Sequence, residues 1–528
     1  MWQVVQHPLG IGLSAFVAFI PLLWLLLSLG VFKMAAHRTC FIAMLMTMLL
    51  AAVAWQMPPG LVATGALDGA ILAIWPILWV IFSAIFTYNM TLQTGAMDKI
   101  KGLMAGFSSD RRVQALLIAW GFGAFLEAAA GFGTAVAIPA AILISLGFNP
   151  FFASVICLIA NTVPVAFGAV GIPVITLAKV ADLDLLRLTL DCAIQLTPFV
   201  MIIPLALIWI MTKSLAGLKG VIGMAIAAGI AFAIPQLIIA AYMGPELTSI
   251  VGSVVSMITI VLWNKISPPK TEWYFPGEQT AKPNGQVFKT SLKEQSIAWS
   301  PYVLLFVLIL GTNNAVLPSL SKWLGTVQTS IQVYFGPGGK PMSIQWLLTP
   351  GTLILIGAVI GGLLQGAALG DMGTVFKKTC SQLKKTTITV VSIVALAKVM
   401  GYSGMVSDIA FALAQTTGSF YPFIAPLVGA LGTFVTGSDT NANVLFGGLQ
   451  KQTALQIGAD PTWIAAANTS GATAGKMISP QSIAIATSAT NQAGIEGDIL
   501  RETAGYCLVY TLLLGAWVYF VNYTRLFL

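Results

Sequence analysis

The chain has 528 residues, of which 57% are hydrophobic and only 8% are charged. Soluble globular proteins carry about 25% charged residues, so this composition excludes a fully water-facing surface and indicates a polytopic membrane protein. The net charge is +8. Without basic runs interleaved with aromatic residues, that charge does not point to nucleic acid, and we expect it to lie in loops that set orientation.

Apolar windows predict the membrane spans in chain order. At ~20 apolar residues per crossing, the length allows about a dozen spans. The windows fall at about 11–32, 39–56, 66–92, 189–212, 219–243, 246–264, 298–318, 350–368, 385–402 and 503–526. Two longer regions, 113–180 and 419–490, are also apolar but are interrupted by Gly, Pro, Asn, Ser and Thr.

Lys and Arg residues are unevenly divided between the two sets of loops. Eighteen of the 26 lie on one side and five on the other, while Lys398, Lys451 and Lys476 lie at membrane depth or its edge. Cytoplasmic loops carry the excess of Lys and Arg, so the richer side is predicted to be cytoplasmic and both termini external. Each interrupted region must then cross an odd number of times. A re-entrant hairpin followed by a broken span meets this condition, although fourteen full spans would satisfy the charges equally well.

The two interrupted regions repeat each other in sequence. Residues 131–134 read Gly-Phe-Gly-Thr and 437–440 read Gly-Ser-Asp-Thr; further on, 160–162 and 467–469 both read Ala-Asn-Thr. Because the spans that precede them run in opposite directions, the repeats are predicted to be inverted. Inverted repeats with broken helices are typical of secondary transporters, which bind substrate where the repeats meet. The predicted fold is therefore an all-α polytopic membrane protein of about 12 transmembrane helices plus two re-entrant hairpins.

The repeats also predict how the chain is divided. Residues 66–188 and 385–502 are expected to form a transport core, each with a hairpin and a broken span. The remaining parts are expected to form a scaffold: 1–65, 189–384 with a cytoplasmic linker at 265–297 and an external loop at 319–349, and the final span at 503–528. We expect the linker and the external loop to be neutral to the transport chemistry.

Polar residues at the predicted hairpin tips and helix breaks suit a small anion. Irregular backbone at membrane depth is tolerated only where it is buried or lines a cavity. Helix N-termini there present N–H groups and a positive dipole end to a carboxylate. The alternative for any single glycine is close helix packing. The predicted substrate-binding residues are Gly131, Phe132, Gly133, Asn161, Thr162, Gly437, Ser438, Thr440, Asn468, Thr469, Ser470 and Lys476.

Two acids, Glu127 and Asp439, lie one in each predicted hairpin. Ionisable residues inside a membrane are costly and point to function by default. A partly desolvated carboxyl can take up a proton, so both acids are predicted to couple transport to protons. The alternative for each is that it caps a half-helix or pairs with a lysine. Lys476 is placed to neutralise a substrate carboxylate or to pair with Asp439.

No enzyme or cofactor chemistry is indicated. The five cysteines lack CxxC spacing, and the two histidines do not form an HExxH motif. No nucleophile–base pair or cofactor motif appears either. We therefore expect a protein that is not an enzyme and that holds neither a cofactor nor a metal, with a co-transported proton instead.

The residues named above resemble those of the L-lactate permease family, most specifically over 475–486, which read Gly-Lys-Met-Ile-Ser-Pro-Gln-Ser-Ile-Ala-Ile-Ala. The resemblance covers nearly the whole chain. It implies a bacterial inner-membrane symporter that takes up L-lactate, and often D-lactate and glycolate, with a proton. Its partners would be this small monocarboxylate and membrane lipid, with the oligomeric state left open. A Na⁺-coupled carboxylate symporter of similar fold is the nearest alternative, and a channel or a membrane receptor is the alternative from another class.

Overall fold

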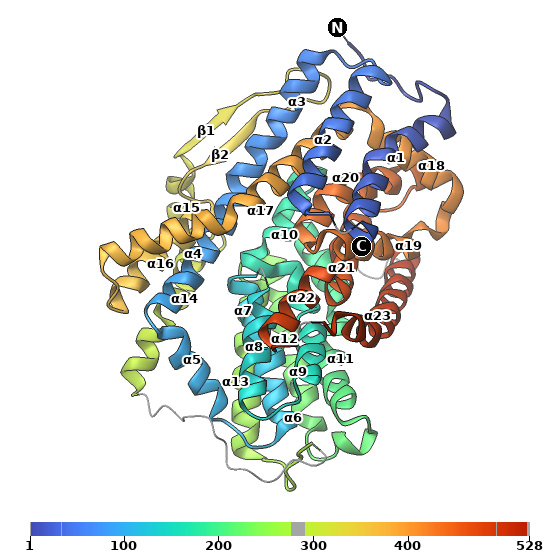
Figure 1. The fold of residues 1–528 in the computed structure, drawn as a ribbon. Coiled ribbons are helices and arrows are strands. Elements are labelled where there is room, and N and C mark those ends of the chain that lie inside the picture. The colour runs from blue at the N-terminus through green and yellow to red at the C-terminus, as the bar shows by residue number, and fades with distance from the viewer. Residues whose placement is uncertain (1, 33, 132, 276–290, 493, 525–528) are drawn as a thin grey trace.

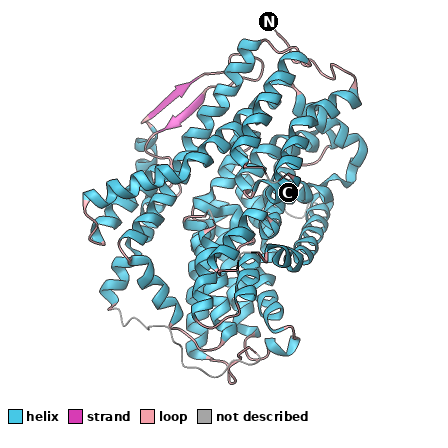
Figure 2. Cartoon of the chain, viewed as in Figure 1, coloured by secondary structure: helices cyan, strands magenta, loops and turns pink. Residues whose placement is uncertain are grey.

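A computed structural model describes residues 2–32, 34–131, 133–275, 291–492 and 494–524, almost entirely as α-helices (Figures 1 and 2). Eleven helices within these residues are long and apolar enough to cross a membrane. The prediction of an all-α polytopic membrane protein is therefore confirmed. One departure is a two-stranded antiparallel ribbon, β1 (Gln328–Ile331) with β2 (Met342–Gln345), in the segment expected to be a plain external loop.

One group of helices, which we call the first bundle, contains both spans that precede the interrupted regions. Glycines allow close approach: a Cβ on Gly69 would lie 2.5 Å from the Cα of Ala395 on the facing helix. The first bundle consists of α2 (Ala36–Val53), α3 (Pro59–Leu72), α4 (Trp79–Gln93), α5 (Ala96–Ala105), α14 (Leu292–Thr312), α16 (Pro350–Leu364) and α17 (Leu369–Ser403). The short α15 (Pro318–Gly325) follows α14.

The second bundle contains both interrupted regions and the helices packed around them. Helices α1 (Ile11–Leu26) and α18 (Met405–Thr417) pack on each other beside the two bundles, α1 against α2 and α18 against α20. The second bundle comprises α6 (Arg111–Gln114), α7 (Gly123–Ala129), α8 (Thr134–Ser145), α9 (Pro150–Ala160), α10 (Gly168–Ala181), α11 (Leu185–Thr212), α12 (Ile222–Tyr242), α13 (Thr248–Ile266), α19 (Tyr421–Thr436), α20 (Asp439–Ile457), α21 (Pro461–Ile478), α22 (Pro480–Ala489) and α23 (Glu496–Thr524).

The order of elements in the second bundle repeats. The helical segment that ends with α7 meets α8 at one tip, and α19 meets α20 at the other. Each hairpin is followed by an interrupted helix, α9–α10 or α21–α22, and then by a long helix, α11 or α23. The contacts between the two repeats are also equivalent. The second helix of each hairpin packs against the later half of the broken helix in the other repeat, α8 against α22 and α20 against α10. The inversion of one repeat relative to the other stays a prediction.

The second helix break is not where the sequence pattern put it. The first break is confirmed, because α9 ends at Ala160 and a short 3-10 turn (Val163–Phe167) follows. A break at 468–471 is wrong: α21 continues to Ile478, and the chain is interrupted at Ser479, whose side chain caps α22 with Pro480 at its first position. The polar residues at 468–471 stay helical because their side chains bond to neighbouring helices, whereas proline lacks the N–H that would continue the helix.

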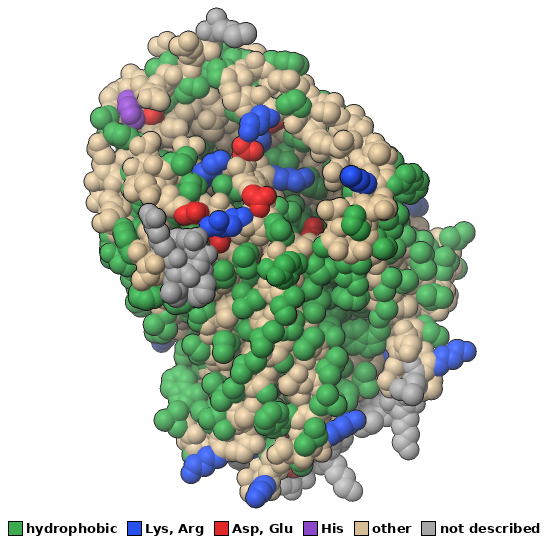
Figure 3. All heavy atoms as spheres, turned by 180° about the vertical axis from the view of Figure 1, so that it is seen from behind, with side chains coloured by type: hydrophobic (Ala, Val, Ile, Leu, Met, Phe, Trp, Pro, Cys, Tyr) green, Lys and Arg blue, Asp and Glu red, His purple; other side chains and the backbone are tan. Residues whose placement is uncertain are grey.

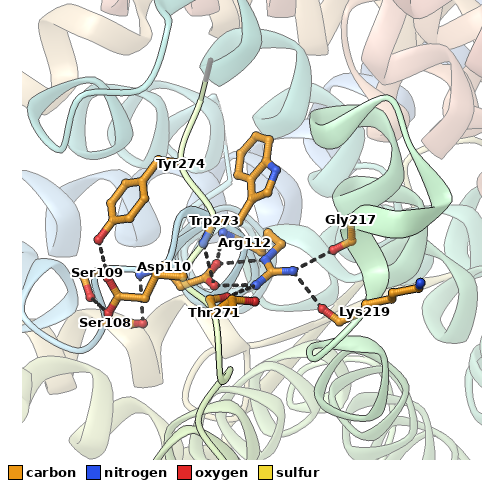
Figure 4. A network of polar contacts seen from close by, with 10 residues as sticks. Ser108, Ser109, Asp110, Arg112, Gly217, Lys219, Thr271, Trp273 and Tyr274 are labelled. Atoms are coloured by element: carbon orange, nitrogen blue, oxygen red, sulfur yellow. Dashed lines mark hydrogen bonds and ion pairs between the residues drawn. The ribbon is translucent and has the colours of Figure 1, made fainter. Parts of the chain in front are cut away.

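The segment after α13 is anchored to the start of the first hairpin (Figure 4). Arg112 and Asp110 form a buried ion pair of 2.7 Å. The Arg112 guanidinium also donates to the carbonyl oxygens of Gly217 at 2.8 Å, Lys219 at 2.9 Å and Thr271 at 3.0 Å. One guanidinium thus joins three chain segments on the side predicted to be cytoplasmic. The rest of the predicted linker, 276–290, lies outside the described residues.

Candidate functional site

A polar cavity of about 360 Å³ lies between the two bundles, where the tips and helix breaks of both repeats meet. One wall is built by the second bundle and the other by α2, α4 and α17. From the second bundle it is lined by Glu127, Gly131, Val165, Gly168, Ala169, Ile172, Pro173, Thr436, Gly437, Ser438, Asp439, Thr440, Asn441, Lys476 and Gln481.

The tip of the second hairpin aims the start of α20 at the cavity. Gly437 has a φ of 71°, and Gln481 lies so close that a Cβ would come within 2.1 Å of its amide oxygen. Glycine is therefore required here both by the backbone and by space. Ser438 caps α20 by accepting from the N–H of Asn441 at 3.3 Å. The first N–H groups of a helix have no intrahelical partner, so this end offers donors and a positive dipole end to an anion.

Lys476 lies at the same tip. Its Nζ donates to the carbonyl oxygen of Gly437 at 2.8 Å, and the side chain is only 9% exposed. The ammonium acts electrostatically on both Glu127 and Asp439. One buried cation and two buried acids therefore line the same cavity, as the sequence pattern had suggested for Lys476 and Asp439.

Asp439 is held from behind by hydrogen bonds. The Thr469 hydroxyl lies 2.9 and 3.0 Å from its two carboxylate oxygens, and Asn443 donates to that hydroxyl at 2.6 Å. The Asn443 amide also donates to the carbonyl oxygen of Pro173 at 3.2 Å. Asn443 therefore links the acid of the second repeat to the broken helix of the first.

Glu127 is less well satisfied. It is 4% exposed, and Oε2 has no hydrogen-bond partner among the described residues. Asn161 lies next to it, but neither atom of the Asn161 amide makes a geometrically complete hydrogen bond within the described chain. Buried polar atoms normally find partners. A carboxylate oxygen and an amide left open beside a cavity indicate a place for a proton, a water molecule or a ligand.

A left-handed turn forms the wall opposite Glu127. Ala169, Val170 and Gly171 have φ values of 43°, 59° and 76°. A β-branched residue such as Val170 rarely adopts a positive φ, and strained residues of this kind concentrate at functional sites. The turn lies directly before the Ile172–Pro173 pair that corresponds to the Ser479–Pro480 break. Both repeats therefore interrupt their broken helix at equivalent positions beside the cavity.

The structure brings together part of the predicted substrate-binding set. Gly131, Gly437, Ser438, Thr440 and Lys476 line the cavity, together with the two acids predicted to couple transport to protons, Glu127 and Asp439. Phe132 lies outside the described residues. The others are buried but do not line it. Gly133 lies against Ile485 of α22, Asn161 lies beside Glu127, the Thr162 hydroxyl donates to the Leu158 carbonyl oxygen, and Asn468, Thr469 and Ser470 lie within α21.

Sequence reasoning missed the wall contributed by the first bundle. Exposed Lys385 and half-buried His37 lie at the open end of the cavity. Thr386 and Thr389 stand three residues apart on α17 and so present hydroxyls on one face. That spacing inside an apolar span was the available signal. The first-bundle lining consists of Ala35, Ala36, His37, Ile81, Lys385, Thr386, Thr389 and Val390.

Comparison with known proteins shows a consistent set of relatives. The family model described as L-lactate permease matches residues 14–525. An L-lactate permease of Streptococcus iniae is 44% identical over 86% of this chain and 93% of its own length. An L-lactate permease of Bacillus subtilis is 38% identical, and the glycolate permease GlcA of Escherichia coli 36%, each over 97% of both chains. The solved structure of Neisseria gonorrhoeae MtrF covers 87% of this chain and 83% of its own, with a TM-score of 0.48 and 13% identity.

Proposed function

The chain belongs to the L-lactate permease family of multi-pass membrane transporters, and from this premise we propose that it carries L-lactate, D-lactate and glycolate together with a proton. We propose further that it works in the bacterial inner membrane with both termini outside. The observation that carries the coupling proposal is that Lys476, Asp439 and Glu127 share one buried cavity.

The tip of the second hairpin would bind the carboxylate of the substrate. The ammonium of Lys476 and the N-terminal N–H groups of α20 supply positive charge and donors for a carboxylate. Thr440, Asn441 and Gln481 line the same side and offer partners for a 2-hydroxyl group. The carboxylate and the hydroxyl group of a small 2-hydroxymonocarboxylate would thus both have hydrogen-bonding partners at this one tip.

Charge balance supports proton coupling. Lys476 is the one buried Lys or Arg that lines the cavity among the described residues, so with both acids ionised the buried wall carries one excess negative charge, which one bound proton removes. Lys385 is exposed at the open end, where water and salt screen its charge. A monocarboxylate that arrives with a second proton leaves the site neutral again. Charge at membrane depth is costly, so a site that is neutral both empty and loaded can reorient in either state. Glu127 and Asp439 are the two proton acceptors in this scheme.

The test is uptake of labelled L-lactate into proteoliposomes under an imposed pH gradient, with and without sodium. Accumulation that follows the proton gradient, is independent of sodium and is competed by glycolate supports the proposal. Dependence on sodium would replace the proton by Na⁺ as the coupling ion. Equilibration without accumulation under either gradient would contradict secondary active transport, and no lactate uptake under any gradient would contradict the substrate.

A further inference from the structure

A second cavity, which we call the vestibule, lies toward the side predicted to be external and has a volume of about 740 Å³. Figure 3 shows charged side chains of both signs gathered in the upper half of the face seen from behind, above a broad apolar surface. The ionisable residues that line the vestibule are Lys179, Lys340, Lys398, Lys451, Asp68 and Asp182. Four lysines face two aspartates, so the vestibule carries an excess of two positive charges.

Two of the four lysines are paired with the aspartates. Lys340 lies 2.7 Å from Asp182 and Lys398 lies 3.3 Å from Asp68. Asp68 also accepts from the Tyr402 hydroxyl at 2.8 Å. These contacts neutralise both aspartates and leave Lys179 and Lys451 without an acidic partner.

Lys451 is engaged by backbone rather than by an acid. Its Nζ donates to the carbonyl oxygens of Ala181 and Asp182 at 2.7 and 3.0 Å, at the C-terminal end of α10. The carbonyls at a helix C-terminus form its negative dipole end, so this lysine stabilises the end of α10. Its charge is already partly balanced by the helix.

Lys179 is the lysine without such a partner. It lies in the last turn of α10, its side chain is exposed to the vestibule, and it makes no hydrogen bond or ion pair with any residue that the structure describes. An unpaired ammonium in a recess bounded by protein attracts anions more strongly than one on an open surface. Lys179 is therefore the lysine of the vestibule that is available to bind an anion.

The vestibule and the polar cavity occupy two ends of one interface. Helices α10, α17 and α20 contribute to both: α10 through Pro173 at one end and Lys179 at the other, about 9 Å apart at 1.5 Å per residue. On α17, the fully buried Ile393 and Val394 lie between the segments that line the two cavities. A short apolar layer thus separates the vestibule from the polar cavity.

We propose that the vestibule is a second binding site for a small organic carboxylate, in which Lys179 holds the anion before it reaches the polar cavity. The inference rests on the proposed function for its direction of use: an anion held at Lys179 would pass from there, between α10, α17 and α20, to the site at Lys476. Residues of the segment 337–343, in the predicted external loop that was expected to be neutral, also line the vestibule.

The first test measures the KM for L-lactate uptake in right-side-out vesicles that carry Lys179→Gln. At about 0.01 M salt, where the Debye length is about 30 Å, we expect KM to rise about threefold to tenfold with the maximal rate unchanged. At about 1 M salt the variant and the wild type should converge. Lys322→Gln is the matched control, because Lys322 is an exposed lysine of α15, in the predicted external loop 319–349, and does not line the vestibule. An unchanged KM and salt dependence in Lys179→Gln would overturn the proposal.

The second test begins with a labelling measurement that does not need transport. In a Cys380→Ser background, which removes the one exposed cysteine among the described residues, Lys179→Cys is labelled with an impermeant thiol reagent. L-lactate should slow the labelling and uncharged lactamide should not; attachment of an aminoethyl group should return KM to the wild-type value, whereas a methyl group should not. Protection by lactate in a protein that does not transport lactate would support the vestibule site and contradict the proposed function. No protection would overturn the site, whatever the transport result.

Discussion

The Thr469 hydroxyl bridges the two carboxylate oxygens of Asp439 at 2.9 and 3.0 Å, from the middle of an uninterrupted helix. Thr469 was predicted to touch substrate at a helix break. Instead it stands one layer behind the polar cavity and fixes the direction of an acid that lines it. Because Asn443 donates to the same hydroxyl, the threonine proton is directed toward Asp439.

Replacing Thr469 by valine should therefore impair transport without removing any cavity-lining group. A hydrogen bond to a charged group contributes about 1.5–3 kcal/mol, so we expect the maximal rate to fall about tenfold or more while KM changes little. The measurement is initial uptake against lactate concentration. Thr469→Ser keeps the hydroxyl and should retain most of the activity. Equal loss in the serine and valine variants would show that the methyl group matters and the hydroxyl does not.

Replacing Asp439 by asparagine should uncouple lactate movement from the proton gradient. The amide keeps the shape of the carboxyl but cannot exchange a proton, so uptake driven by a pH gradient should be lost while exchange of internal for external lactate continues. The comparison of driven uptake with exchange in the same proteoliposomes checks this. Glu127→Gln is the companion variant. If it retains driven uptake while Asp439→Asn loses it, Glu127 is not needed for coupling; the reverse result would assign coupling to Glu127 instead of Asp439. Wild-type coupling in both variants would remove both acids from the mechanism.

Replacing Lys476 by methionine should weaken substrate binding. The ammonium donates to the Gly437 carbonyl and is the one Lys or Arg that the second bundle contributes to the lining of the polar cavity among the described residues. Losing a charge-assisted contact of about 1.5–3 kcal/mol should raise KM by about tenfold to a hundredfold. Lys476→Arg keeps the charge and should show a smaller increase. Monodispersity in detergent, measured beside uptake, separates weak binding from misfolding.

Much of the site could be predicted from the sequence because membrane depth makes polar residues conspicuous. Glu127, Asp439 and Lys476 stand out in apolar surroundings, and the structure brings all three to one cavity. The repeat pattern also located both tips, since the glycines at 131 and 437 have positive φ values of 61° and 71°. These features depend on local sequence and on the cost of burying polar groups, both of which a sequence displays.

The parts that were missed depend on packing between distant segments. Nothing local in 468–471 reveals that Gln450 and Asn443 hydrogen-bond to Asn468, so the helix there continues where a break was expected. Likewise, Lys385 reads as an ordinary loop-side lysine until α17 is placed against the hairpin tips. A side chain that lines a site from another bundle can be recognised as part of that site only when the packing of the two bundles is known.

Substituting alanine for Gly168 should disturb Glu127 without straining the backbone. The residue has an ordinary extended conformation, with φ −64° and ψ 156°, but a Cβ would lie 2.8 Å from Glu127 Oε1. Overpacking of this kind costs about 1–3 kcal/mol and would displace the carboxyl from the polar cavity. We expect driven uptake to fall at least fivefold. Gly505→Ala is the control, because a Cβ there meets nothing within 4 Å on α23. Full activity in Gly168→Ala would show that the position of Glu127 is not critical.

Replacing Arg112 by methionine should destabilise the protein at the side predicted to be cytoplasmic. Arg112 is 3% exposed, pairs with Asp110 and donates to three backbone carbonyls (Figure 4). Its removal leaves a buried acid without its counter-ion and three carbonyl oxygens without this donor. Breaking a buried ion pair on one side costs about 3–5 kcal/mol, and a clear fall in Tm in detergent is expected. The double variant Arg112→Met with Asp110→Asn removes the unpaired charge and should recover part of that loss. A double variant as unstable as Arg112→Met alone would assign the stabilisation to the carbonyl contacts at 217, 219 and 271 instead of to the ion pair.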